Sequence, residues 1–314
     1  MKSHGRSSQR ARLRRPSDMS KLPRVSVLMT IYNAGPWLRE AIESILAQTY
    51  VDWELIAIEN GSTDESPAIL ASYKDSRIRL IGLHENMGRT PALRLAFDLA
   101  RGEYIAILDA DDLAERTRLQ KQIAFMDTHG DVAVVGTWAV RIDSAGKEVG
   151  RWAPATDPAQ LSDQLGFENP IVHSAAMYRA ELARAVGGYP LEHPYAQDSG
   201  LWLRLASRGR VGMIGEYLSY HRTLQNGLTR SKESQVIVSR DSLSLLEYAG
   251  LHLPLSRRAQ RRNREERTIA ACRYAIALMR TGQLRAGLMV LTRTVAANPA
   301  GMVWNRVYRT AVFG

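Results

Sequence analysis

The chain has 314 residues, of which 45% are apolar, so it can bury a substantial core as one large α/β domain with an appendage or as two modest domains. Its single cysteine, Cys272, excludes an internal disulfide framework and a cysteine-based zinc site. Because no apolar run approaches the length of a membrane span and the N-terminus lacks the apolar core of a signal peptide, we expect a cytoplasmic protein.

The net charge of +10 is unevenly distributed along the chain. Residues 1–24 and 250–314 hold 8 and 12 basic residues, and the remaining segment, 25–249, carries a net charge of −7. An acidic body with basic ends is not typical of nucleic-acid-binding domains, whose basic residues line the folded face. The basic ends could hold the protein at the inner face of a membrane through anionic lipid, and the alternative is a solvated tail and a solvated helix face.

The first third of the chain alternates between two kinds of element. Residues 1–23 are polar and unpatterned, and we expect a disordered basic tail. From Val25 onward, the apolar spacing predicts strands at 25–31, 53–58, 77–83 and 104–108, and helices at 36–48, a segment ending near 73, and 91–100. This order predicts a Rossmann-like, mostly parallel sheet with helices on both faces.

The rest of the chain is mixed at first and then purely helical. We expect helices at 115–128, 179–186 and 198–207, and strands at 132–138, 140–142, 171–178, 211–214 and 217–221. Further helices are predicted at 231–249, 263–281, 283–297 and 299–312. The chain thus divides into the tail at 1–23, an α/β domain at 24–229 with halves at about 24–112 and 113–229, and a helical region at 230–314.

Three carboxylates, Asp109, Asp111 and Asp112, follow the last strand of the first half within four positions and are expected to meet solvent. Carboxylates packed this closely repel one another, and a hard divalent cation that also takes phosphate oxygens offsets that cost. The alternative is a strand end followed by an Asp-rich helix N-cap. Tyr32 and Glu59 also follow predicted strands, and parallel sheets bind ligands at the carboxyl ends of their strands. This coincidence favours an active site at that edge.

These motifs belong to a longer series in a fixed order. The series comprises residues 25–33, 59–64, 86–88 with Arg89 next, 102–112, His173, 187–189 and 197–204. In this order and spacing it resembles glycosyltransferase family 2 over roughly residues 25 to 222. The resemblance implies a GT-A-type fold and an inverting transfer of a sugar from a nucleotide-diphosphate sugar, with a UDP-sugar favoured, to a hydroxyl acceptor.

The resemblance also implies roles for single residues. Asp198 would be the general base that takes the proton of the attacking hydroxyl. Asp111 would bind Mn²⁺ or Mg²⁺, with Asp109 and His221 as further candidate ligands, and the cation would neutralise the leaving diphosphate. The candidates for acceptor binding are His173 and Trp202, although a core tryptophan is the alternative for Trp202. The candidates for binding the donor nucleotide are Thr30, Tyr32, Glu59, Asn60, Arg89 and Asp109.

Several positions depart from the family pattern. Thr30 stands where proline is usual, Asn60 makes the pair after the second strand Glu-Asn instead of Asp-Asp, and Gln197 replaces a common glutamate. His221 lies two positions earlier than the usual histidine, but positions two apart share one face of a strand. A surface histidine near a strand end is the alternative for His221.

Two other functions remain as alternatives. A nucleotidyltransferase would carry a Gly-rich, basic phosphate loop after the first strand, but residues 30–36 contain one glycine and no lysine or arginine. A non-catalytic sugar-nucleotide-binding protein would be expected to lose Asp109, Asp111 or Asp198, and all three are present. The family resemblance implies surface polysaccharide or glycolipid assembly, and therefore a saccharide or lipid-linked acceptor.

Overall fold

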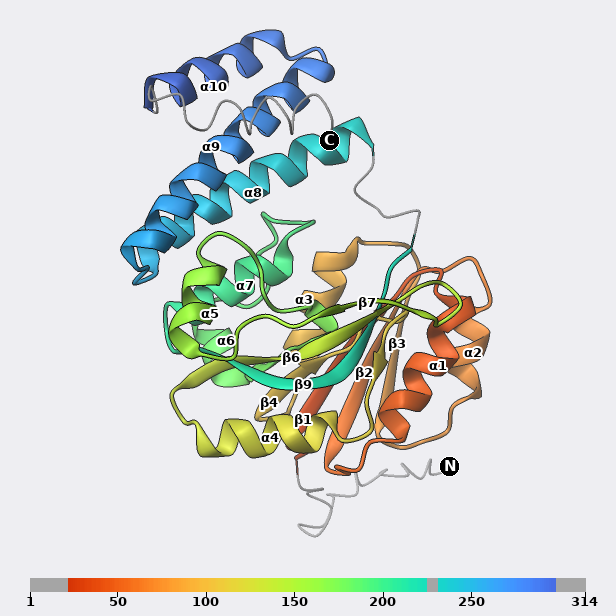
Figure 1. Cartoon of the computed structure of the whole chain (residues 1–314). Coiled ribbons are helices and arrows are strands. Elements are labelled where there is room, and N and C mark those ends of the chain that lie inside the picture. Colours follow the sequence, from red (N-terminus) through yellow and green to blue (C-terminus); the bar gives the residue numbers. More distant parts are fainter. Residues whose placement is uncertain (1–21, 225–230, 298–314) are drawn as a thin grey trace, which may run out of the picture.

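The computed structural model describes residues 22–224 and 231–297 (Figure 1). The tail expected at 1–23 lies almost entirely outside this range, as do the expected boundary at 229 and the helix expected at 299–312. The elements of the first half follow the expected order. They are β1 (Val25–Ile31), α1 (Gly35–Leu46), β2 (Trp53–Asn60), α2 (Ser66–Ser72), β3 (Ile78–Leu83), α3 (Arg89–Leu99) and β4 (Tyr104–Ile107).

The second half contains longer strands than the sequence predicts, because the two pairs of short strands expected at 132–142 and 211–221 are continuous. The segment 143–170, without predicted elements, holds β7 and α5. The elements are β5 (Leu113–Ala114), α4 (Arg118–Thr128), β6 (Val132–Ile142), β7 (Glu148–Trp152), α5 (Pro158–Leu165), β8 (Met177–Arg179), α6 (Ala180–Ala185), α7 (Gln197–Ala206) and β9 (Arg210–Arg222).

The strand predicted at 171–178 is wrong for most of its length. The structure has a 3-10 turn at His173–Ala175, and only β8 follows as a strand. Side chains of α4 fix this turn, since Arg118 donates to the carbonyl of Ser174 and Gln122 Nε2 donates to the carbonyl of Ala175 at 2.9 Å. These contacts come from a distant helix, so the apolar pattern of the segment does not reveal them.

A single sheet with the strand order β3-β2-β1-β4-β8-β6-β9-β5 runs through the domain, with β7 paired to β6. Strands β1 to β4 are parallel, and β8 pairs antiparallel with both β4 and β6. The register Ile31↔Glu59 brings the carboxyl ends of β1 and β2 together. The α/β fold class with a mostly parallel, curled sheet is confirmed.

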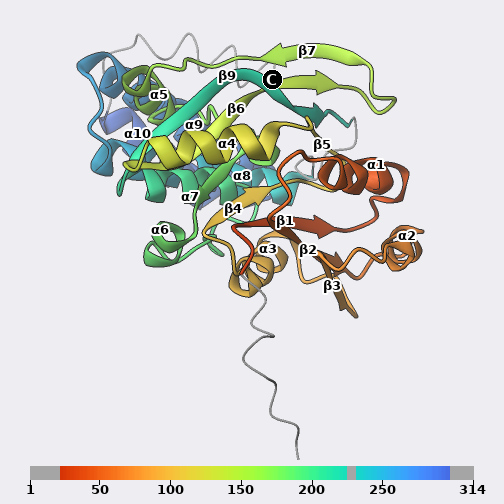
Figure 2. The same ribbon diagram turned by 90° about the horizontal axis from the view of Figure 1, so that it is seen from below.

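Helices cover both faces of the sheet, as expected (Figure 2). One apolar core lies beneath α1, α2 and α4, and includes Leu38, Ile42 and Leu119. The other lies beneath α3, α5, α6 and α7, and includes Phe97 and Trp202. The strands between them are buried on both sides, which is why they read as near-continuous apolar runs.

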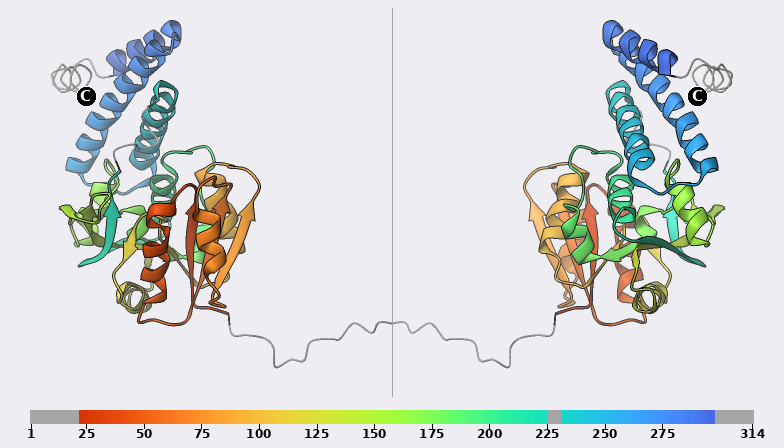
Figure 3. Two further views of the ribbon diagram at one scale, coloured as in Figure 1. Left: turned by 90° about the vertical axis from the view of Figure 1, so that its right-hand side faces the viewer. Right: turned by 90° about the vertical axis from the view of Figure 1, so that its left-hand side faces the viewer.

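The helical region comprises α8 (Lys232–His252), α9 (Arg257–Arg280) and α10 (Leu284–Ala297), and it projects from one end of the α/β domain (Figure 3). The buried Asn263 fastens it, because its Nδ2 donates to the carbonyls of Gly166 at 2.6 Å and Leu246 at 2.8 Å. Helix α9 begins at Arg257, six residues before the start predicted at 263. Within the described part of the chain, no helix has the length and apolarity needed to cross a membrane.

Candidate active site

The carboxyl ends of β1 and β2 are tied together by short polar contacts. Glu59 Oε1 accepts a hydrogen bond from the backbone N–H of Ser62 at 2.6 Å. Asp64 accepts from the backbone N–H groups of Gly35 and Ser66, each at 2.9 Å, and so satisfies the first turns of α1 and α2. Tyr32 is 46% exposed at this edge, and its ring is accessible to a ligand.

Asn60 determines where the next helix begins. Its side chain is buried, donates to Asn86 Oδ1 at 3.1 Å and the carbonyl of Gly88 at 3.3 Å, and accepts from the N–H of Met87 at 3.0 Å. Gly88 has a φ of +90°, a conformation that favours glycine. The loop is thereby fixed, and Arg89 becomes the first residue of α3.

Arg89, Asp109 and His173 form one polar network, in which His173 is buried, Asp109 is partly buried and Arg89 is still accessible to solvent. Arg89 donates to Asp109 Oδ2 at 2.6 Å, and Asp109 Oδ1 lies 3.0 Å from His173 Nδ1. Burial alone would raise the pKa of Asp109, but the charges of Arg89 and His173 outweigh it and hold that pKa well below its usual range. The charge of Asp109 raises the pKa of Arg89 against the effect of burial, and the charges of Asp198 and Asp111 add to it. Three of the predicted carboxylates therefore act on one guanidinium.

Asp111 is the unpaired member of the acidic cluster. Within the described residues its carboxylate has no hydrogen-bond or ion-pair partner on another residue, whereas its backbone carbonyl accepts from Arg222 Nε at 2.8 Å. Burial, followed by the charges of Asp112 and Asp109, raises the pKa of Asp111 to about 7. The attraction of Arg89 does not outweigh these effects, so the folded protein presents a carboxylate without a direct partner, as expected of a cation ligand.

Asp112 does not meet solvent, contrary to the prediction for the cluster. It is 1% exposed and accepts from the Ser174 hydroxyl at 2.5 Å and from the backbone N–H of Arg222 at 2.7 Å. His221 Nδ1 lies 3.2 Å from the same carboxylate, and this contact raises the pKa of His221 above its usual value. Asp112 therefore connects β9 and the 3-10 turn to the end of β4.

Two buried arginines that the sequence reasoning missed complete this scaffold. Arg118 is fully buried and donates to the carbonyl of Ile107 at 2.8 Å; burial lowers its pKa to about 10. Arg222 donates to the carbonyls of Asp143 and Ser144, each at 3.1 Å. No local pattern marks either residue, because their partners lie far away in the sequence.

Asp198 lies in the first turn of α7, as predicted. Asn169 Nδ2 donates to Asp198 Oδ2 and to the Ser199 hydroxyl, each at 3.0 Å. The orientation of the Asn169 amide is itself fixed, because its Oδ1 accepts from the N–H of Ile171 at 3.0 Å. Asn169 thus positions the Asp198 carboxylate, although nothing in the sequence singled it out.

A cavity of about 300 Å³ brings some of these side chains together. Its lining includes five predicted residues, namely Arg89, Asp109, His173, Asp198 and His221. Thr30, Tyr32, Glu59, Asn60 and Asp111 are not part of this lining. Trp202 is fully buried behind His173, with ring centroids 6.3 Å apart, so the structure has the core tryptophan that was the alternative to acceptor contact.

Comparison with protein families gives the decisive observation. The model described as glycosyl transferase family 2 matches residues 26–187, more than half of the chain. The chain belongs to this family. Among its relatives, EpsE of Bacillus subtilis, named as a glycosyltransferase, is 36% identical over 199 residues, which are 62% of this chain and 70% of EpsE. TuaG of the same organism, named for teichuronic acid biosynthesis, is 29% identical over 67% of this chain and 83% of TuaG.

Solved structures of glycosyltransferases share the fold. TarS of S. aureus, in complex with UDP-GlcNAc, superposes with a TM-score of 0.64 over 87% of this chain and 81% of that one, at 17% identity. The mannosyltransferase PcManGT of Pyrobaculum calidifontis, in complex with GDP-Man and Mn²⁺, gives 0.59 over 93% and 80% at 18% identity. The chain is therefore a GT-A-type glycosyltransferase, whose relatives include proteins named for polysaccharide biosynthesis.

This glycosyl transferase family 2 chain does not hold a complete protein-only metal site within its described residues, because no three acidic, histidine or cysteine side chains converge there. A hard divalent cation does not need one, since it commonly takes one or two carboxylates and fills its shell with water and substrate phosphate. The unpaired Asp111 fits this requirement. Asp112 does not, because its oxygens already accept hydrogen bonds from Ser174 and Arg222.

Proposed function

We propose that the chain is an inverting glycosyltransferase that moves a sugar from a nucleotide-diphosphate sugar to a hydroxyl of a saccharide or lipid-linked acceptor. The setting would be surface polysaccharide or glycolipid assembly at the inner face of the membrane. The observation that carries the proposal is the shared cavity, which is lined both by Asp198 and by the Arg89–Asp109–His173 network. Attack by an acceptor hydroxyl on the donor requires a base and a cluster that can hold the donor within one cavity.

The donor would lie at the carboxyl ends of β1, β2 and β4. Tyr32 offers an exposed ring for the nucleobase, with Thr30, Glu59 and Asn60 beside it, and Asp109 is held in its charged form to accept a ribose hydroxyl. A UDP-sugar is the favoured donor, and the TarS complex with UDP-GlcNAc supports it. The GDP-Man complex of PcManGT makes a GDP-sugar the second candidate.

Asp111 would hold Mn²⁺ or Mg²⁺, with Asp109 and His221 as further candidates. Such a cation, when bound, neutralises the negative charge that develops on the leaving diphosphate. The chain's own residues would carry out the remaining work. Asn169 holds the Asp198 carboxylate so that it can accept the proton of the attacking hydroxyl. The ion pair with Arg89 keeps Asp109 ionised.

The test begins with release of nucleoside diphosphate from UDP- and GDP-sugars in the presence of Mn²⁺ or Mg²⁺, together with a thermal-shift screen of nucleotides. Asp198→Asn should then lower the transfer rate by about 10²–10⁴-fold, the usual cost of losing a positioned base. Nucleotide affinity, measured by calorimetry, should hardly change, because Asp198 lies in α7 and the donor nucleotide is expected at the carboxyl ends of β1, β2 and β4.

Asp157→Asn is the matched control. Asp157 is exposed and caps α5, accepting from the N–H of Gln160 at 2.9 Å, and it does not line the cavity. If Asp198 were only a helix cap, the two variants would have equally small effects on transfer. Proton NMR of the product reports the second half of the proposal, since retention of the donor's anomeric configuration would reject an inverting reaction.

A further inference from the structure

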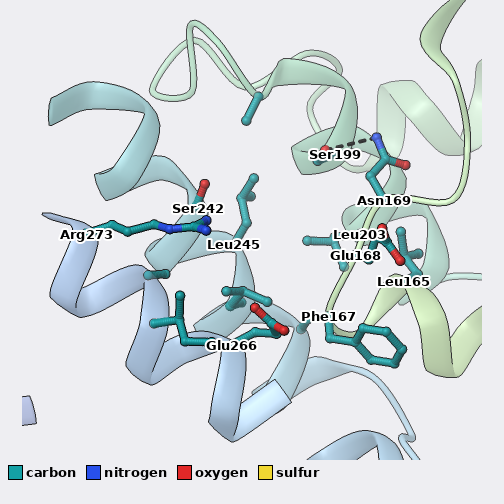
Figure 4. A pocket seen from close by; sticks show the side chains of 15 residues that line it. Leu165, Phe167, Glu168, Asn169, Ser199, Leu203, Ser242, Leu245, Glu266 and Arg273 are labelled. Carbon is teal, nitrogen blue, oxygen red and sulfur yellow. Dashed lines mark hydrogen bonds between the residues drawn. The ribbon is translucent and has the colours of Figure 1, made fainter. Parts of the chain in front are cut away.

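A second cavity, of about 260 Å³, lies between the α/β domain and the helical region (Figure 4). Its walls come from the segment after α5, from α7, and from α8 and α9. The apolar part includes Phe167, Leu245 and Ile269, and the polar part includes Ser242, Glu266 and Arg273. This volume is near the lower end of the range for small-molecule sites, roughly 300–1,000 Å³.

The cavity adjoins the catalytic one through a single layer of side chains. Asn169 lines both cavities, and its Nδ2 donates to the Ser199 hydroxyl (Figure 4). The same Nδ2 also donates to Asp198 Oδ2. Ser199 lines the second cavity and Asp198 the first. A ligand in the second cavity would therefore lie next to the proposed general base.

Several hydrogen bonds anchor the helical walls of the cavity to the α/β domain. Asn263 of α9 donates to the carbonyls of Gly166 and Leu246, and the Ser256 N–H donates to Asp163 Oδ1 at 2.8 Å. At the other end, Arg240 of α8 donates to the carbonyl of Glu192 at 3.0 Å. These bonds fix the helices on both sides of the cavity, so the space is part of the native architecture.

The lining suits a ring that has both apolar and hydroxyl-bearing sides. Within the described residues, the Ser242 hydroxyl and the Arg273 guanidinium have no hydrogen-bond or ion-pair partner, although both line the cavity. A hydroxyl on a helix can bond a carbonyl one turn back, as that of Thr268 does with Arg264 at 3.0 Å, but the Ser242 hydroxyl does not. An acyl chain would desolvate Ser242 and Arg273 without supplying hydrogen bonds to them, whereas a sugar can supply them.

We propose that this cavity binds a sugar unit of the acceptor, adjacent to the unit whose hydroxyl is glycosylated. The apolar face of the ring would pack against Phe167 and Leu245, and its hydroxyls would bond to Ser242 and Arg273. This inference rests on the proposed function and adds to it the substrate class, an acceptor of at least two sugar units. It also gives the helical region a part in acceptor recognition.

The experiment compares acceptors of different length on the full chain. The probes are p-nitrophenyl mono- and disaccharides of glucose, galactose, mannose and N-acetylglucosamine, with the donor identified by nucleotide screening. Transfer kinetics and saturation-transfer NMR are measured for the wild type and for two variants, Arg273→Ala and Ser242→Phe. The first removes a charged donor, and the second fills the cavity from α8.

We expect disaccharides to have a lower KM than monosaccharides with the wild type. Each variant should raise the disaccharide KM about tenfold or more, Arg273→Ala because it removes a hydrogen bond to a charged group and Ser242→Phe because its ring occupies the cavity. The KM for monosaccharides and the affinity for the donor nucleotide should not change. Arg280→Ala and Ser244→Phe are the matched controls, since both positions lie on the same helices and neither lines the cavity.

Two failures can be told apart. If the proposed function is wrong, the wild type releases no nucleoside diphosphate from any donor and transfers nothing. If only this inference is wrong, the wild type transfers normally and the variants keep the wild-type disaccharide KM, which would make the cavity a packing void. Absence of saturation-transfer signals from every disaccharide with the wild type would likewise overturn the assignment.

Discussion

Replacing Asp112 with alanine should destabilise the protein strongly, whereas the same change at Asp111 should leave its stability almost unchanged. The two carboxylates are neighbours in sequence but differ in their surroundings. Asp112 is 1% exposed and accepts from the Ser174 hydroxyl and the Arg222 N–H. The Asp111 carboxylate has no partner on another described residue, and the charges of Asp112 and Asp109 oppose its own.

The magnitude follows from the donors that the Asp112→Ala change would leave behind. Each buried donor left without an acceptor costs about 1–3 kcal/mol, so two give about 2–6 kcal/mol. His221 adds little, because its side chain is 43% exposed and water can replace the contact. At about 2–4 °C per kcal/mol for a domain of this size, the melting temperature should fall by roughly 5–20 °C. The Asp111→Ala variant should instead melt near the wild type, because it removes a repelled charge.

Differential scanning calorimetry and urea unfolding of both variants would measure this contrast. The Asp112→Asn variant serves as an isosteric control and should lose less, since an amide oxygen can still accept the bond from the Arg222 N–H. An Asp112→Ala variant that melts within about 2 °C of the wild type would refute the reasoning. Loss of nucleotide binding by Asp111→Ala with unchanged melting would confirm the division of roles.

Two further predictions concern the cation and the membrane. Chelation of the divalent cation should abolish turnover. Burial and neighbouring charges raise the pKa of Asp111 to about 7. Cation-dependent nucleotide affinity should therefore rise between about pH 6 and pH 8, as the Asp111 carboxyl loses its proton. Calorimetry in two buffers of different ionisation enthalpy would detect the proton release; a flat pH profile contradicts it. The full chain should bind anionic liposomes, and added salt should weaken this binding. Replacing Arg257, Arg258 and Arg264 with glutamine should also weaken it, because these three arginines have no acidic partner among the described residues. Equal binding to neutral liposomes would leave the solvated-face alternative.

The strand ends can be predicted from the sequence because the signal there is local. Buried parallel strands read as apolar runs, and the residues after them must lie at one edge of the sheet. The strand-end pattern points to Asp109 and the family resemblance to Asp198, and both line the same cavity in the fold. The C-terminal helices are also predictable, although α9 begins at Arg257 and not near 263. The apolar spacing of these helices is clear in the sequence, and the Arg-rich segment obscures only where α9 begins.

The residues that the sequence does not reveal act through partners far away in the chain. Arg222 donates its backbone N–H to Asp112, 110 positions earlier, and Asn169 bonds Asp198 from a loop 29 positions before it. A buried arginine and a surface arginine look alike in one sequence. The 3-10 turn at His173–Ala175 escapes prediction for the same reason, since Arg118 and Gln122 fix it from another helix. A single sequence carries no signal for such pairs.

The acidic cluster illustrates how the fold separates structure from function within four residues. Asp109 is compensated by Arg89 and Asp112 by hydrogen bonds, so both contribute to a fixed scaffold. The Asp111 carboxylate has no hydrogen-bond or ion-pair partner on another described residue. Its raised pKa means that ionising this carboxyl costs more free energy in the folded chain than in water. A cation that binds there removes the cost, so part of its affinity comes from relief of the repulsion that the scaffold maintains. Removing one neighbouring charge with Asp109→Asn should therefore lower the pKa of Asp111 and shift the rise in cation-dependent nucleotide affinity to lower pH. Above about pH 8, where Asp111 is ionised in both proteins, the same change should weaken cation binding, because less negative charge remains at the site.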